Sequence, residues 1–120
     1  MTGYETFIQL LKSKKIKYTP NSLGSEFTID GDKFIVRNFD SPMVQIIIII
    51  DVSQHSKSTI METCNFMNDN AFLAKFMYVE QAHTVYARID IYPTPNFISD
   101  DYFAPMALLN RACTVFKQKL

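Results

Sequence analysis

Five consecutive isoleucines, Ile46 to Ile50, lie within the segment VQIIIIIDV and constrain the fold of this chain more than any other feature. A strand that faces water on one side alternates apolar and polar side chains, because successive side chains point to opposite faces of the sheet. This segment does not alternate. We therefore expect residues 43–52 to form a central strand whose second face is covered over part of its length, by the chain itself or by a partner.

Composition favours one globular domain. The chain has 120 residues, of which 48% are hydrophobic and 20% are charged, and these values fit a single domain over residues 1–120. Lys plus Arg and Asp plus Glu balance at 12 each, so no net field would attract nucleic acid or an anionic membrane. The first residues lack the pattern of a secretion signal, and the isoleucine run is far shorter than the about 20 residues of a membrane span. We expect a cytoplasmic protein without nucleic-acid or membrane partners.

Periodicity and turn signals predict an α+β domain. Thr2 and Glu5 have the spacing of a capping box, and an amphipathic pattern follows over residues 3–16. Asp30–Gly31 has the composition of a tight hairpin turn. The other predicted segments are, in chain order, a loop at 19–25, a hairpin of two strands at 26–39, a strand at 43–52, a helix at 57–69, strands at 72–80 and 84–92, and a helix from Asp101 or Tyr102 to residue 120.

The order of these elements predicts an antiparallel sheet, because every connection between successive strands is short. We expect the order α-β-β-β-α-β-β-α, with five antiparallel strands and the helices mainly on one face. The second face would then carry Ile47 and Ile49 from the central strand and Tyr86, Arg88 and Tyr92 from the last strand. Tyrosine and arginine are enriched at interface hot spots, but a solvated sheet face is an equally open interpretation.

Two helices carry apolar side chains outside their main stripes. Phe66 lies roughly opposite the stripe of the second helix when residues are placed about 100° apart. Leu108 and Val115 lie beside the main stripe of the last helix in the same way. Single exposed aromatic residues are common, so simple exposure to solvent is the alternative. The candidate partner-binding residues are Ile47, Ile49, Phe66, Tyr86, Arg88 and Tyr92.

The sequence predicts no catalytic residue, no metal site and no cofactor. Cys64 and Cys113 lie on the apolar stripes of their helices, where a buried thiol stays protonated, and we interpret both as reduced core residues. His55 and His83 lie in turn segments without the spacing of metal ligands. The pair Asp100–Asp101 precedes a helix and is interpreted as its cap.

The segment from TIMETCNFMNDNAFLAKFMYVE to TVYARIDIYP, about residues 59–92, resembles the bacterial YbjN domain. In that domain a helix with an Asn-rich end leads into a hairpin of two long strands, and an amphipathic helix closes the domain. The order of elements over the whole chain is similar to that of the type III secretion chaperone fold. Asn65, Asn68 and Asn70 occupy the Asn-rich helix end, where we expect them to contribute helix termination and turn geometry.

This resemblance implies a small homodimer without enzymatic activity that binds a protein partner. Secretion chaperones bind an extended segment of a client protein across exposed hydrophobic grooves and sheet surface. We therefore expect a non-enzymatic, cytoplasmic protein-binding module, chaperone-like or regulatory, that acts as a homodimer. The alternative is a small-molecule-sensing regulator or enzyme subunit that uses the Tyr86 and Arg88 face as a pocket.

Overall fold

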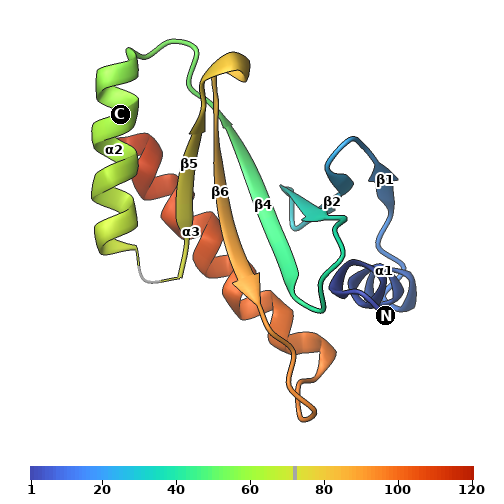
Figure 1. Ribbon diagram of the computed structural model, residues 1–120. Helices are drawn as coiled ribbons and strands as arrows, with labels where there is room; N and C mark the ends of the chain where they lie inside the picture. The colour runs from blue at the N-terminus through green and yellow to red at the C-terminus, as the bar shows by residue number, and fades with distance from the viewer. Residues whose placement is uncertain (72) are drawn as a thin grey trace.

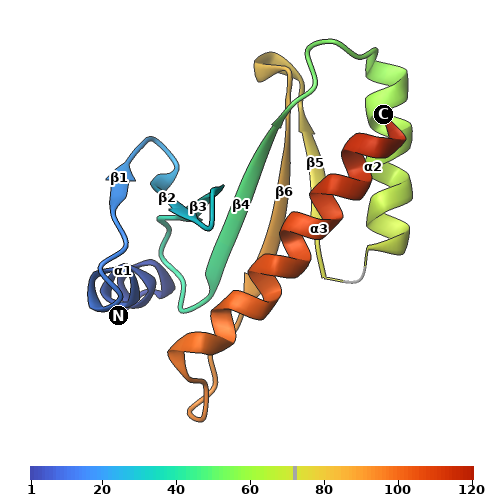
Figure 2. The same cartoon turned by 180° about the vertical axis from the view of Figure 1, so that it is seen from behind.

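The computed structural model describes residues 1–71 and 73–120. Its strands form one antiparallel sheet in the order β1-β2-β3-β4-β6-β5. Figure 1 shows the sheet with α2 and α1 at its two ends, and Figure 2, seen from behind, shows α3 running obliquely across the other face of the sheet. The elements are α1 (Gly3–Ser13), β1 (Tyr18–Pro20), β2 (Gly24–Ile29), β3 (Asp32–Arg37), β4 (Val44–Asp51), α2 (Lys57–Asn70), β5 (Lys75–Val79), β6 (Thr84–Ile91) and α3 (Phe103–Lys119).

The hydrophobic core lies between the helices and one face of the sheet. Phe7 of α1 packs against Phe27 of β2, with ring centroids 5.2 Å apart. At the other end of the sheet, Phe116 of α3 stacks on Phe76 of β5 at 5.1 Å. The fold is therefore α+β, and among the described residues no helix packs on the opposite face of the sheet.

The isoleucine strand is β4, which lies in the interior of the sheet between β3 and β6. Its even-numbered side chains, within Val44–Val52, face the helices and are buried or half-buried. On the other face Gln45 and Ile47 are also buried, whereas Ile49 is exposed. The prediction that the second face is covered over only part of its length is confirmed.

The prediction of five strands is wrong, because the described residues form a sheet of six. The additional strand is β1, which lies partly in the segment that we expected to be a loop. The side chain of Asn21 accepts hydrogen bonds from the backbone N–H groups of Leu23, at 3.0 Å, and Gly24, at 2.9 Å. These bonds fold the chain back tightly enough to pair three residues with β2. The strand was not predicted because Pro20 argues against a strand, although an edge strand tolerates a residue without a backbone N–H.

The first helix is shorter than predicted and ends at Ser13, not near residue 16. Lys15 adopts the left-handed conformation, with φ of 57°. The N–H of Ile16 then donates to the carbonyl of Leu11 at 2.9 Å, and the N–H of Lys15 donates to the carbonyl of Lys12 at 3.1 Å. This is a Schellman ending, which glycine usually supplies. A lysine in the glycine position left no signal in the sequence.

Most of the other local predictions are confirmed. Asp30 and Gly31 both have positive φ, at 51° and 85°, as a two-residue hairpin turn requires. A short 3-10 turn precedes α3, and in it the carboxylate of Asp101 accepts from the backbone N–H of Ile98 at 2.9 Å. The strand expected from residue 72 begins at Lys75 in the structure, and Phe72 itself lies outside the described residues.

Candidate binding surface

The sheet face that turns away from the helices carries an apolar row across three strands. Ile49 of β4 is paired with Tyr86 of β6, and Tyr86 is paired with Met77 of β5. Ile49 is 41% exposed and Met77 is 54% exposed, with the half-buried Tyr86 between them. Arg88 lies two residues further along β6 on the same face. We call these four residues, Ile49, Met77, Tyr86 and Arg88, the open face.

Met77 was not among the predicted site residues. Its strand alternates as an amphipathic strand does, with the buried Phe76 between the exposed Lys75 and Met77. That alternation was available in the sequence. Alternation within one strand does not show that Met77 lies beside Tyr86, because their pairing is a property of the sheet.

Ile47 and Ile49 share one face of β4 but differ in access to solvent. Ile47 is only 3% exposed, although no described helix covers it. Its register neighbours are Ile35 on β3, which is also buried, and Arg88 on β6. The chain therefore covers Ile47 with its own side chains, and Ile49 is the isoleucine of this face that a partner can reach.

A polar network surrounds Gln45 on the second face of β4. The guanidinium Nη1 of Arg37 donates to Oε1 of Gln45 at 3.2 Å, and Nε2 of Gln45 donates to Oδ1 of Asp90 at 2.8 Å. Nη1 of Arg88 lies 3.6 Å from Oδ2 of the same aspartate. The network satisfies the buried amide of Gln45 and places a carboxylate beside Arg88.

The remaining two predicted residues lie away from the open face. Tyr92 follows the last residue of β6 and is exposed. It is six positions from Tyr86, which corresponds to about 20 Å along an extended strand. Phe66 lies on α2, in the helical layer. The structure thus brings together Ile49, Tyr86 and Arg88, and separates Phe66 and Tyr92 from them.

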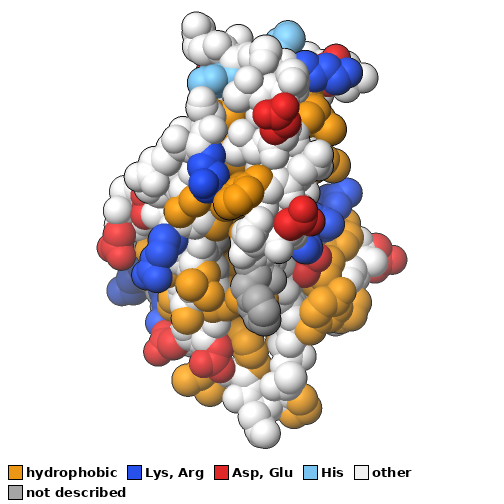
Figure 3. Space-filling view, turned by 90° about the vertical axis from the view of Figure 1, so that its left-hand side faces the viewer, with side chains coloured by type: hydrophobic (Ala, Val, Ile, Leu, Met, Phe, Trp, Pro, Cys, Tyr) orange, Lys and Arg blue, Asp and Glu red, His pale blue; other side chains and the backbone are white. Residues whose placement is uncertain are grey.

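Phe66 instead lies beside Leu108 and Val115, the exposed large apolar side chains of α3. A hollow of about 240 Å³ between α2 and α3 is lined by Phe66, Leu108 and Val115 together with Arg111. Nζ of Lys119 lies 4.2 Å from the centre of the Phe66 ring. Figure 3 looks onto the α2 side, where hydrophobic side chains reach the surface among charged ones. We call this feature the α2–α3 groove.

Asn68 and Asn70 have different roles at the end of α2. Nδ2 of Asn70 donates to the carbonyl of Phe66 at 2.7 Å, which is a helix-terminating contact. Asn68 instead binds the edge strand β5: its Nδ2 donates to the carbonyl of Phe76 at 3.0 Å, and its Oδ1 accepts from the N–H of Phe76 at 2.7 Å. The side-chain amide takes the place of a neighbouring strand at this position. Such capping limits the addition of another chain to the sheet edge.

The two cysteines are free and buried, as the sequence predicted. Burial raises the pKa of the Cys113 thiol to about 12 and also raises the pKa of Cys64. Both thiols are therefore protonated at neutral pH and poorly nucleophilic. His55 and His83 are exposed. Among the described residues, no group of three or more His, Cys, Asp or Glu side chains is placed to hold a metal ion.

A separate cavity of about 540 Å³ lies between the β2–β3 hairpin and α3. Phe34 and Met106 contribute apolar lining, and Asp32, Asn110 and Arg111 contribute polar groups. Nδ2 of Asn110 donates to the Asp32 carboxylate at 3.0 Å, so part of this polar lining is already paired. Neither Tyr86 nor Arg88 lines this cavity.

In the part of the chain that the structure describes, no helix is both long enough and apolar enough to cross a bilayer.

No protein-family model and no curated protein matches this chain. Among solved structures, the fold is similar to that of an uncharacterized protein from Methanothermobacter thermautotrophicus, with a TM-score of 0.61 and 12% sequence identity. The alignment covers 97% of this chain and 94% of the archaeal one. At this identity the likeness shows a shared fold and nothing about activity.

Proposed function

We propose that this protein is a non-enzymatic protein-binding module, chaperone-like or regulatory, that acts as a homodimer and binds a protein partner through its open face. The observation that supports this proposal best is the continuous apolar row of Ile49, Tyr86 and Met77 on a sheet face that no helix of the described residues covers. A partner that removes these apolar side chains from water would stabilise the complex by about 25 cal/mol for each Å² of apolar surface buried.

The charges beside the row suit a partner with acidic side chains. Arg88 is paired in the sheet with Lys75, two residues along the strands from the Met77–Tyr86 pair and on the same face. Arg88 has Asp90 at 3.6 Å, while among the described residues Lys75 forms no ion pair. A partner segment that places an apolar side chain over Ile49 and Met77 and a carboxylate near Lys75 would complement both features.

A YbjN-like and secretion chaperone-like assignment is part of the same proposal. Its support is the order of elements after β4, in which a helix with an Asn-rich end leads into an antiparallel hairpin and a closing helix. The non-enzymatic part of the proposal has support from the buried thiols, whose raised pKa values leave them unsuited to nucleophilic catalysis. A cytoplasmic location belongs to the proposal as well.

The test uses a photo-reactive amino acid at position 49 or 77 in cells that express the chain. We expect both positions to crosslink to the same protein, which is then purified and titrated against the wild type by calorimetry. Ile49→Asp and Met77→Asp should each weaken that binding by tenfold or more, because central contact residues commonly contribute over about 1.4 kcal/mol each.

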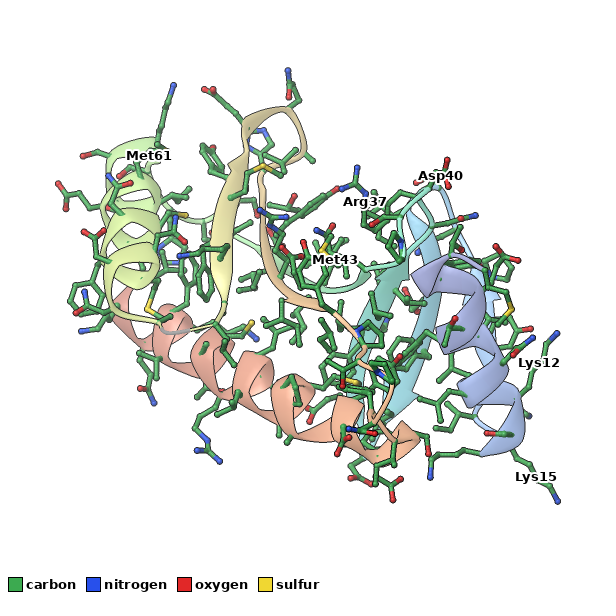
Figure 4. All side chains as sticks on the ribbon, turned by 60° about the horizontal axis from the view of Figure 1, so that its bottom comes forward. Lys12, Lys15, Arg37, Asp40, Met43 and Met61 are labelled. Carbon is green, nitrogen blue, oxygen red and sulfur yellow. The ribbon has the colours of Figure 1, made fainter. Side chains whose placement is uncertain are left out.

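The matched control is Met61→Asp on α2, because Met61 is 41% exposed, as is Ile49. Figure 4 places Met61 at the α2 end of the molecule, away from Arg37 and Met43. The control should leave the titrated affinity unchanged. Equal losses in the control and open-face variants, or crosslinks no different from those formed at position 61, would contradict binding through the open face.

A further inference from the structure

The α2–α3 groove is the second large apolar feature of the surface. Its hollow of about 240 Å³ adjoins another of about 150 Å³, and the two share Ala71, Leu108 and Ala112 in their linings. Phe66, Leu108 and Val115 are all exposed along it. These residues come from α2 and from the C-terminal part of α3, which runs obliquely and approaches α2 there (Figure 2). The groove is thus a continuous depression with large apolar side chains at its margins.

The two helices that form the groove have opposite charges. α3 carries Arg111, Lys117 and Lys119 and contains no Asp or Glu. Beyond its first residue, Lys57, α2 carries only Glu62 and Asp69, and Lys57 itself is held by Glu80 at 3.3 Å. Within the described residues, none of the charged side chains that follow Lys57 on α2, and none on α3, forms an ion pair. An acidic helix and a basic helix therefore lie next to each other with their charges unpaired.

We propose that a second copy of this chain covers the α2–α3 groove, with the two-fold axis of the dimer running along the groove. A rotation of 180° about that axis places α2 of each copy on α3 of the other. The dimer then contains two equivalent contacts, in each of which the acidic α2 of one copy faces the basic α3 of the other. The apolar margins of the two grooves meet in the middle of the interface. Such an interface is isologous, because the same patch serves both copies.

The size of the surface agrees with this role. The helices have 14 and 17 residues, which at 1.5 Å per residue gives lengths of about 21 and 25 Å. Where the C-terminal part of α3 adjoins α2 (Figure 2), the two helices together are about 20 Å wide. The resulting face is of the same order as the roughly 800 Å² per partner that stable interfaces bury.

This inference rests on the proposed homodimer and assigns it a surface. It also separates two functions in space, because the open face lies on the side of the sheet that turns away from the helices. The dimer interface and the partner-binding face can then be occupied together. A variant that disrupts one face should leave the other face intact.

The experiment exchanges the charges of the two helices in separate proteins. One variant makes α2 basic through Glu62→Lys and Asp69→Lys, and the other makes α3 acidic through Arg111→Glu and Lys119→Glu. In the proposed geometry each variant repels its own copy, because like charges face each other across the axis. An equimolar mixture restores attraction in both contacts, since the basic α2 meets the acidic α3 and the unchanged helices also meet as opposites.

Light scattering coupled to size exclusion, at several concentrations, measures the outcome. We expect a wild-type dimer, a dissociation constant raised at least tenfold in each variant, and recovery to within about threefold of wild type in the mixture. Circular dichroism checks the fold of each variant, and all four substituted side chains are exposed. Val115→Asp should also produce a folded monomer, whereas Met61→Asp, on the other side of α2, should remain a dimer.

Three results would overturn the inference. They are a wild type that stays monomeric at high concentration, variants that dimerise as tightly as wild type, and a mixture that associates no better than its components. Ile49→Asp keeps this test separate from the proposed function: it should remain a dimer while losing the protein partner. A monomeric wild type whose partner binding still depends on Ile49 would reject the dimer and retain the open face.

Discussion

Replacement of Asn68 by alanine tests how the edge of the sheet is held. The side-chain amide makes two hydrogen bonds to the backbone of Phe76, at 2.7 and 3.0 Å. A net contribution of about 1 kcal/mol for each bond gives a loss of about 2 kcal/mol. The substitution also stabilises the helix by about 0.6 kcal/mol, because alanine has a higher helix propensity than asparagine. We therefore expect Asn68→Ala to lower the free energy of unfolding by about 1.4 kcal/mol.

The matched control is Asn65→Ala, three residues earlier on the same helix. Asn65 is exposed, and among the described residues its side chain makes no hydrogen bond. The change in helix propensity is the same in both variants, so the difference between them isolates the two bonds to Phe76 and should be about 2 kcal/mol. Urea denaturation followed by circular dichroism measures both variants, and hydrogen exchange should show the amide of Phe76 losing protection only in Asn68→Ala.

Equal stabilities for the two variants would refute the role assigned to Asn68. That role would also be refuted if the amide of Phe76 stayed protected from hydrogen exchange in Asn68→Ala, because water or a neighbouring group would then have replaced the asparagine. A further expected consequence is easier self-association at low denaturant, since the freed backbone groups of β5 would offer an unpaired strand edge.

Three other substitutions or reactions test separate parts of the structure. Ile47→Asp should lower the free energy of unfolding by about 3–5 kcal/mol, because it places a carboxylate in a buried site. In the same denaturation assay, Ile49→Asp should lower it by about 1 kcal/mol or less. Similar losses in the two variants would contradict the different burial of the two side chains. Gly24→Ala should unfold the protein or shift the hairpin, because a Cβ at this position would overlap the carbonyl of Val36, and a variant with a wild-type melting temperature would show that the strands are further apart. Burial raises the pKa of Cys113 to about 12, so reaction with a thiol reagent at pH 8 should be slow in the folded protein and should accelerate as pH rises or urea unfolds the chain; rapid labelling of Cys113 without urea would contradict its burial.

The local elements could be predicted because their signals are local. The capping box at Thr2 and Glu5, the positive φ angles at Asp30–Gly31 and the bounds of α2 are set by residues within a few positions of one another. The signals that failed were also local, but they were carried by unusual residues. Lys15 takes a position that glycine usually occupies, and Pro20 lies inside a strand.

The candidate surfaces depended on the sheet and could be predicted only in part. Alternation along one strand identifies the face on which a side chain lies, so Ile49, Tyr86 and Arg88 could be grouped before the register was known. Alternation does not give the neighbours of that side chain on the next strand. Met77 was therefore missed, although the register places it beside Tyr86.

The sequence by itself determined that β4 is central and that one of its faces is core, because a run of five isoleucines cannot face water along its whole length. Only the tertiary structure decided which isoleucine of the second face remains accessible. Ile47 is covered by side chains from β3 and β6, and Ile49 lies beyond that cover. The physical reason is that periodicity assigns direction within one element, whereas burial depends on atoms that other elements bring to the same place.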